Sequence, residues 1–356
     1  MISDPARMGA AEGSKPGHLM AAEIAEQPDV LARVLASSQS AVEEVAVRLR
    51  AAGPRFVLLA ARGTSDHAAL YAKYLVETRL GLPVGLVSTS TYTTYGGSPD
   101  LRDVLWVAVS QSGSSPDLVE STSVARARGA VTLAVTNAAE SELAKTAKLH
   151  LDLCAGPERS VAATKTYTAS LLTLYLLVAA WGEQESSAAQ RLPGLAADVL
   201  DLPEVDEVAA RYRFVDKLVT TSRGFAYPTA REAALKLMET CYLSAHAFSG
   251  ADLLHGPLAM IDADRPVVAI VPEGAGGQAL APVLKQLTDR GADLCVVSPA
   301  APAKASAVLP LPSGIDEELA PIVQIIPLQQ LALQMAVSRG HDPDRPRGLA
   351  KVTQTR

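Results

Sequence analysis

Short apolar runs alternate with stretches of helical spacing along most of the chain. Residues 56–61, 104–109 and 131–135 are aliphatic runs of strand length, and polar loops lead from the first two into helical segments. Runs that are apolar throughout, rather than at every second position, are typical of parallel strands covered on both faces. The pattern therefore predicts an α/β fold built on doubly wound parallel sheets.

The same order of landmarks returns in the second half of the chain. Gly224 lies 161 residues after Gly63, and Gly274 lies 161 residues after Gly113. Because unrelated domains would rarely keep one spacing, the repeat indicates an internal duplication with a junction near residues 182–203. The predicted divisions are a disordered tail at 1–17, a helical segment at 18–52, tandem domains at 53–182 and 203–341, and a C-terminal tail at 342–356.

Composition narrows the class of function. Hydrophobic residues make up 48% of the chain and charged residues 20%, which fits a globular protein. The net charge of −6 argues against nucleic acid and anionic membranes as partners. The most apolar run, 169–181, is shorter than the roughly 20 residues that span a bilayer, so we expect a buried helix there.

The spacing of cysteine and histidine predicts neither a disulfide framework nor a metal site. The three cysteines lie far apart, and no pair of histidines has the spacing of metal ligands. The sequence also lacks the Walker lysine motif and Gly-x-Gly-x-x-Gly, so no nucleotide or other cofactor is expected. These features are typical of a protein of the reducing cytoplasm.

Residues 110–115, here called the anion loop, carry the clearest candidate chemistry. The loop reads Ser-Gln-Ser-Gly-Ser-Ser and leaves the carboxyl end of a predicted strand, where open α/β sheets bind ligands. Ser115 suits the cap of the next helix and Pro116 its first position, so free backbone N–H groups would face a phosphate. Ser110 and Ser112 add hydroxyl donors. The alternative is a flexible Ser/Gly connection.

Three other places have a structural and a chemical interpretation. After the first strand, Gly63 permits a tight turn, and Thr64 and Ser65 would cap the next helix or contact a ligand. His255 precedes Gly and Pro, a combination typical of a turn, and Lys351 lies in the C-terminal tail. We retain all four polar residues as site candidates.

The predicted helix at 229–242 places Glu232, Lys236 and Glu239 on one face, at spacings of four and three. A carboxylate that is shielded from water can serve as both base and acid, because burial raises its pKa toward neutrality. The alternative is a solvated salt-bridge ladder on the helix surface.

Six motifs together resemble one family, the isomerase half of glucosamine-6-phosphate synthase, which is built from two sugar isomerase (SIS) domains. The resemblance extends from about residue 23 to the C-terminus. The motifs are Arg62-Gly63-Thr64-Ser65, Ser110-Gln111-Ser112-Gly113, Val161-Ala162-Ala163-Thr164-Lys165, Glu232-Ala233-Ala234-Leu235-Lys236, His255-Gly256-Pro257-Leu258-Ala259 and Leu349-Ala350-Lys351.

The resemblance implies a role for each candidate. Glu239 would move a proton between carbons 1 and 2, and His255 would assist ring opening from the neighbouring subunit of a dimer. Lys351 would approach the carbonyl carbon, where a lysine can form a Schiff base. Glu232 and Lys236 would support the pocket. The remaining roles are phosphate binding by Ser110, Gln111, Ser112 and Ser115, and sugar contacts by Ser65 and Val161, with Thr64 a further candidate.

The chain also departs from the synthase pattern. It shows no N-terminal glutaminase domain and no cysteine near residue 2, so glutamine is not the expected nitrogen source. The continuation at 114–117 is more similar to stand-alone amino-sugar-phosphate deaminases. Met238, His246 and Leu254 stand where the family usually has Lys, an acidic residue and a basic residue.

We therefore expect conversion of glucosamine 6-phosphate to fructose 6-phosphate with release of ammonia. One alternative is a dehydratase (lyase) that eliminates water from N-acetylglucosamine 6-phosphate, and a second is a non-catalytic sugar-phosphate sensor. A homodimer is expected, because the family's histidine works across the subunit boundary and because the apolar helix at 169–181 would need cover.

Overall fold

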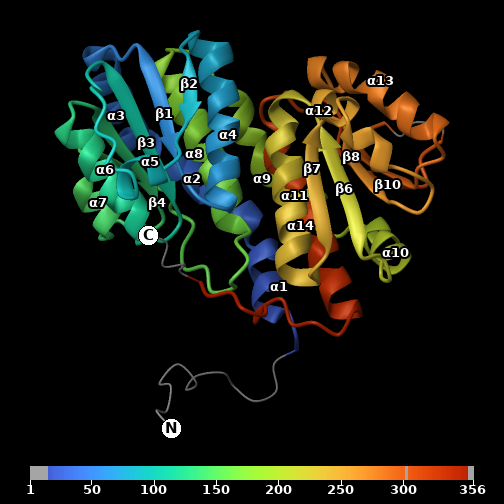
Figure 1. Cartoon of the computed structure of the whole chain (residues 1–356). Helices are drawn as coiled ribbons and strands as arrows, with labels where there is room; N and C mark the ends of the chain where they lie inside the picture. The colour runs from blue at the N-terminus through green and yellow to red at the C-terminus, as the bar shows by residue number, and fades with distance from the viewer. Residues whose placement is uncertain (1–14, 301–303, 352–356) are drawn as a thin grey trace.

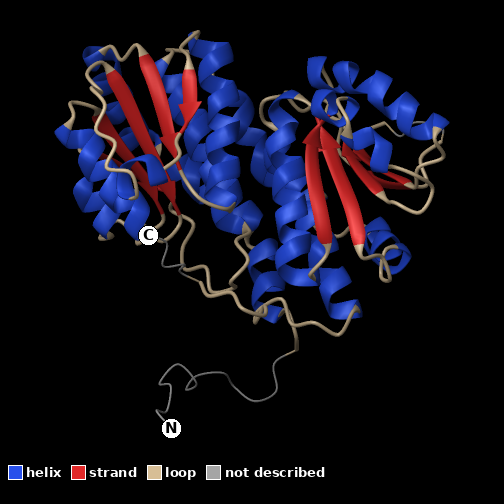
Figure 2. Cartoon of the chain, in the orientation of Figure 1, coloured by secondary structure: helices blue, strands red, loops and turns tan. Residues whose placement is uncertain are grey.

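The computed structural model describes residues 15–300 and 304–351, and it contains two five-stranded parallel sheets. Helices lie on both sides of each sheet, as expected for a doubly wound fold (Figure 2). The α/β fold class is therefore confirmed. Most of the predicted tail at 1–17 lies outside the described residues.

The predicted helical segment at 18–52 consists of three helices. They are α1 (His18–Ala25), α2 (Gln27–Ser37) and α3 (Gln39–Ala52). Pro28 accounts for the first break, since proline is favoured in the first turn of a helix and disfavoured in its interior.

The first sheet has the strand order β2-β1-β3-β4-β5. Its strands are β1 (Phe56–Ala60), β2 (Val84–Leu86), β3 (Val104–Ser110), β4 (Val131–Thr136) and β5 (Leu149–Asp152). Its helices are α4 (Thr64–Leu75), the π-helical turn η2 (Val76–Leu80), α5 (Ser90–Thr93), α6 (Pro116–Ala127), α7 (Glu142–Thr146) and α8 (Lys165–Trp181).

Three short helices lead to the second sheet, whose strand order is β10-β9-β8-β6-β7. The connecting helices are η3 (Ser187–Arg191), α9 (Leu192–Asp198) and α10 (Pro203–Arg211). The strands are β6 (Lys217–Ser222), β7 (Ser244–Ser249), β8 (Val267–Ile270), β9 (Leu294–Ser298) and β10 (Ala307–Pro310). The helices are η4 (Gly224–Ala226), α11 (Tyr227–Cys241), α12 (Gly250–Leu254), η5 (Pro257–Met260), α13 (Ala275–Asp289) and α14 (Ala320–Ser338).

The two sheets have the same topology. Read from the other edge, the second sheet runs β7-β6-β8-β9-β10, which is the order of the first sheet. The glycines that mark the repeat have positive φ in both copies, at Gly63 and Gly224 and at Gly113 and Gly274. The predicted internal duplication thus appears in topology as well as in sequence.

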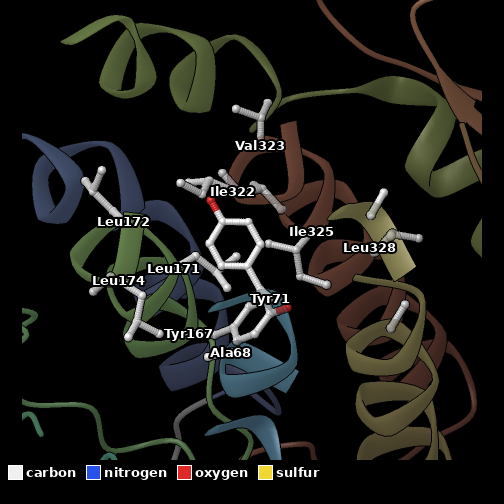
Figure 3. Packing of buried hydrophobic residues seen from close by; sticks show 14 of the residues in the cluster. Ala68, Tyr71, Tyr167, Leu171, Leu172, Leu174, Ile322, Val323, Ile325 and Leu328 are labelled. Atoms are coloured by element: carbon white, nitrogen blue, oxygen red, sulfur yellow. The ribbon is translucent and has the colours of Figure 1, made fainter. Parts of the chain in front are cut away.

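The two halves share a core. Helices α4 and α8 of the first half pack toward α11 and α14 of the second (Figure 1). Tyr71 on α4 lies among Leu171, Ile322 and Ile325 (Figure 3), and its hydroxyl donates to the Glu318 carbonyl at 2.7 Å. This packing fixes the position of one half against the other.

The apolar helices are covered within the chain. Helix α8 contains the run 169–181 and is almost wholly buried, so the expectation that a partner subunit must cover it is wrong. Its apolar positions face α2, α3, α4 and α14 on several sides. Helix α14 is long and apolar enough to cross a bilayer, but 83% of its most apolar window is buried inside the protein, as in a core helix.

Candidate functional site

A cavity of about 250 Å³ opens where the order of the first sheet reverses, between the loops that follow β1 and β3. Ligands of open α/β sheets bind at this switch point. The cavity brings together many of the residues proposed from sequence, which are Thr64, Ser65, Ser110, Gln111, Ser112, Ser115, Val161 and Lys351. It also contains lining residues that the sequence interpretation did not select, which are Arg62, Gly63, Ala163, Thr166, Tyr167 and Ser170.

The anion loop is a shaped turn rather than a flexible connection. The Gly113 N–H donates to Ser110 Oγ at 3.1 Å, and the Ser114 N–H donates to Ser112 Oγ at 3.3 Å. A Cβ atom at Gly113 would lie 2.2 Å from Ser141 Oγ, and its φ of 63° also favours glycine. Ser115 occupies the N-cap position of α6, but its hydroxyl does not make the predicted capping bond.

Thr64 connects the cavity to the second half of the chain. Helix α4 begins at Thr64 with Gly63 at its cap position, so the alternative that Thr64 or Ser65 caps the helix is wrong. The Thr64 hydroxyl instead donates to Glu232 Oε1 at 2.9 Å and accepts from Lys236 Nζ at 3.1 Å.

Glu232, Lys236 and Glu239 form a continuous charge cluster on α11. Lys236 Nζ lies 3.2 Å from Glu232 Oε1 and 2.6 Å from Glu239 Oε2, while His67 Nδ1 lies 2.7 Å from Glu232 Oε2. The side chains of Glu232 and Lys236 have no exposed surface, so these two do not form the solvated ladder considered above. The Glu239 side chain is 23% exposed. None of the three lines the cavity directly; Thr64 joins them to it.

Burial and charge act against each other in this cluster. Burial tends to raise the pKa of Glu232, but the Lys236 charge and the His67 contact outweigh it, so the pKa lies below the usual carboxylate value. Burial likewise tends to lower the pKa of Lys236, but Glu232 and Glu239 raise it well above its usual value. Each group therefore depends on the other to remain charged inside the protein.

Lys351 reaches the cavity from the C-terminal tail. Its Nζ donates to Glu158 Oε2 at 3.0 Å and to the Ser160 carbonyl, and the Glu158 side chain has no exposed surface. Glu23 lies beside this pair and accepts from the Ser160 N–H. Burial raises the pKa of Glu23. The tail lysine is therefore held in place rather than solvated.

Two contacts hold the tail on its path to the cavity. Asp344 accepts hydrogen bonds from the Leu19 and Met20 N–H groups at 2.9 Å each, at the start of α1. The Arg347 guanidinium lies 3.9 Å from the centre of the Tyr242 ring. The sequence analysis did not select Glu158, Asp344 or Arg347. Each of them contacts a residue far away in the sequence, and only the folded chain brings the partners together.

His255 does not reach the cavity within the chain. It is exposed at the end of α12, and its N–H donates to the Asp252 carbonyl at 3.0 Å. Met238, His246 and Leu254, where the chain departs from the family pattern, are exposed as well and do not line the cavity.

The equivalent loop of the second half already holds an anion. The Ala275 and Gly276 N–H groups at the start of α13 donate to the two carboxylate oxygens of Glu317, at 2.8 Å each. A Cβ at Gly274 would lie 2.3 Å from Glu317 Oε2, so glycine there admits the carboxylate. The same place in the repeated fold thus binds an oxyanion supplied by the chain itself.

Within residues 15–300 and 304–351, no three His, Cys, Asp or Glu side chains are grouped so that they could hold a metal ion.

The SIS-domain family profile matches residues 52–180 and 213–339. The chain is 36% identical, over 94% of its length, to the glutamine–fructose-6-phosphate aminotransferase of Methanothermobacter thermautotrophicus, and it spans 57% of that protein. It is also similar to the crystal structure of the C-terminal domain of glucosamine-fructose-6-phosphate aminotransferase from Francisella tularensis. The identity is 28%, the coverage is 95% of this chain and 100% of that one, and the TM-score is 0.85.

A second solved structure is similar to this chain over almost the whole length of both chains. An inferred phosphosugar isomerase from Silicibacter pomeroyi is 34% identical, over 91% of this chain and 99% of that one, with a TM-score of 0.81. The duplicated sheets, the loop at the switch point and these matches lead to one conclusion: the chain belongs to the SIS-domain family and contains two SIS domains.

Proposed function

We propose that the protein is an enzyme that converts glucosamine 6-phosphate and water into fructose 6-phosphate and ammonia. The observation that carries this proposal is the combination in one cavity of an oxyanion-binding loop and a primary amine, linked through Thr64 to a buried acid–base cluster. The aminotransferases to which the chain is similar are named for fructose 6-phosphate and glucosamine.

The anion loop is proposed to hold the 6-phosphate. It ends at the N-terminus of α6, where backbone N–H groups and the helix dipole favour an anion. The Glu317 carboxylate at the equivalent place of the second SIS domain supports this assignment. Gln111 and the Ser112 and Ser115 hydroxyls would complete the phosphate contacts.

Replacing Ser112 and Ser115 together by Ala is expected to weaken sugar-phosphate binding by about 1–3 kcal/mol, as for lost hydrogen bonds to a charged group. Isothermal titration calorimetry measures the change. Ser114→Ala is the matched control, because its exposed hydroxyl donates to the Ser112 carbonyl and does not line the cavity. Equal affinities of the double variant and wild type would place the anion elsewhere.

The proposed reaction begins on the opened sugar, with an aldehyde at carbon 1 and the amino group at carbon 2. Glu239, which is connected to the cavity through Lys236 and Thr64, takes the proton from carbon 2 while the oxygen at carbon 1 takes up a proton, which gives an enolamine. A proton then returns to carbon 1 and the amino group loses a proton, which leaves a hydroxyl at carbon 1 and an imine at carbon 2. Water adds to the imine, the carbon–nitrogen bond breaks, and ammonia leaves. Lys351 would hold or polarise the carbonyl at carbon 1, since its Nζ is fixed at the cavity.

His255 is proposed to complete the site of a second subunit in a homodimer. Its exposure at the end of α12 and its absence from the cavity's lining residues agree with such a role. Met238 is 41% exposed and Leu254 36%, so apolar side chains on α11 and α12 are also available for an interface.

Mixed dimers test this assignment. His255→Ala and Glu239→Gln chains should each be inactive alone, whereas refolding them together should recover about a quarter of wild-type activity, because each mixed dimer contains one intact site. Refolding Glu239→Gln with the Ser112/Ser115 double variant is the control and should give no more activity than the double variant has by itself, since each site of that mixed dimer carries one of the changes. Sedimentation at micromolar concentration should show a dimer; an active monomer would refute the assignment.

The substrate is tested by incubating the protein with glucosamine 6-phosphate and with its N-acetyl form. We expect ammonia and fructose 6-phosphate from the first and no product from the second. An ultraviolet-absorbing product from the N-acetyl form would instead identify a dehydratase. Tight binding of either sugar without turnover would identify a sensor.

A further inference from the structure

Arg62 stands at the N-terminus of α6, beside the anion loop. Its Nε donates to Asp117 Oδ2 at 3.0 Å, and a terminal nitrogen donates to the Thr89 hydroxyl. Asp117 lies in the first turn of α6, two residues after Ser115, and its side chain is 2% exposed. The Arg62 side chain is 45% exposed and lines the cavity. A buried carboxylate therefore fixes an accessible guanidinium next to the proposed phosphate site.

The charge of a phosphate ester favours a cationic side chain at its binding site. The anion loop contains only uncharged side chains, and the end of a helix contributes roughly half an elementary charge. A phosphate monoester carries about −1.5 to −2 at pH 7. Arg62 and Lys351 are the cationic side chains among the cavity's lining residues. Lys351 is paired with Glu158, and neither residue belongs to the anion loop.

The geometry of Arg62 also suits an oxyanion. A guanidinium presents five N–H donors in a planar fork, so one edge can be anchored while another meets a second anion. Asp117 Oδ2 also accepts from the Thr89 hydroxyl at 2.9 Å, and Asp117 Oδ1 accepts from the Leu118 N–H. These contacts orient the carboxylate, and the carboxylate orients the guanidinium, before any ligand binds.

The second SIS domain also has an arginine, Arg223, at the position that corresponds to Arg62, directly before Gly224. There the loop amides hold the Glu317 carboxylate, which satisfies that anion position from within the chain. The two copies of the fold therefore differ in what lies against the loop: a carboxylate of the chain in the second copy, and a cavity lined by Arg62 in the first.

We propose that Arg62 is a substrate-binding residue that recognises the dianionic phosphate and thereby restricts the cavity to phosphorylated sugars. The inference rests on the proposed function only in taking the anion loop as the phosphate site. It adds a residue to that site and a reason why a neutral sugar would bind poorly.

The test is the affinity of wild type, Arg62→Lys and Arg62→Met for inorganic phosphate, measured by calorimetry between pH 5 and 8. Wild-type affinity should rise with pH as phosphate becomes a dianion, near pH 6 to 7. Arg62→Met should bind phosphate at least about 10-fold more weakly at pH 8 and lose most of this rise, and Arg62→Lys should be intermediate. For the amino-sugar phosphate, KM should increase while kcat stays within about threefold.

Two further variants separate recognition from a structural clamp. Thr89→Val disturbs the Arg62–Asp117 contacts but keeps the guanidinium, so phosphate affinity should change by less than about threefold. Arg126→Gln removes an exposed charge at the other end of α6 and should change nothing. If Arg62→Met binds phosphate as wild type does, with the same pH dependence, Arg62 is a clamp and the inference is wrong. If wild type itself binds no phosphate, the proposed phosphate site fails as well.

Discussion

Glu239→Gln is expected to lower turnover by about 100-fold or more while substrate affinity stays within a few-fold of wild type. Glutamine keeps the size and much of the hydrogen bonding of Glu239, but it removes the base that takes the proton from carbon 2. The Lys236 contact at 2.6 Å can be kept by the amide oxygen, so the α11 cluster should remain folded. With glucosamine 6-phosphate as the substrate, steady-state kinetics measures the turnover and calorimetry measures the affinity.

Hydrogen exchange at carbon 2 makes the test independent of the overall reaction. Wild type in deuterated water should exchange that hydrogen, and Glu239→Gln should not. This holds for deamination and for dehydration, because both begin with the same proton transfer. Glu207→Gln, an exposed change on α10, is the control and should exchange like wild type. If Glu239→Gln exchanges this hydrogen at the wild-type rate, Glu239 is not the base and its charge has only a structural role.

Lys236→Met should reduce the free energy of unfolding by about 3–5 kcal/mol, the usual effect of removing one partner of a buried ion pair. The variant leaves Glu232 without its lysine at a position with no exposed side-chain surface, where Thr64 and His67 remain as its hydrogen-bond partners. Urea unfolding at pH 7 measures the change. Lys285→Met is the matched control: its side chain is 75% exposed and pairs with Asp289, so its effect should be below about 0.5 kcal/mol.

The difference between wild type and Lys236→Met should shrink in acid. The folded pKa of Glu232 lies below its unfolded value, so its ion pair contributes stability above the unfolded pKa, about 4.3. That contribution is lost as the pH falls through the folded pKa. In the variant, Glu232 can take up a proton more easily, which relieves the unpaired charge. A difference that stays constant from pH 7 to pH 3 would show that Lys236 acts through packing alone.

Patterns along the chain were sufficient for the architecture. Buried strands such as β3 are continuous apolar runs, and helices such as α6 begin at Pro after a Ser, so each element depends mainly on its own residues. The repeat of glycines at one spacing predicted two sheets of the same order, because each marks a turn with positive φ in the same place of the fold. The anion loop was found for the same reason: it is one contiguous segment.

Tertiary structure decided how the separate motifs are connected. Thr64 hydrogen-bonds to Glu232, 168 residues further along the chain, and Lys351 pairs with Glu158, 193 residues earlier. No local pattern encodes such pairs. The burial that turns the helical face of Glu232 and Lys236 from an apparent solvated ladder into a buried ion pair comes from the packing of α4, α14, β6 and β7 around α11.

The sequence by itself determined the fold class, the duplication and the segment at the switch point, since local periodicity and turn residues suffice for these. Only the tertiary structure decided that the second copy of the loop is filled by Glu317, that Arg62 stands beside the first, and that the tail holds Lys351 at the cavity. The physical reason is that a charge is positioned by the counter-charges and amides around it, and those come from distant parts of the chain.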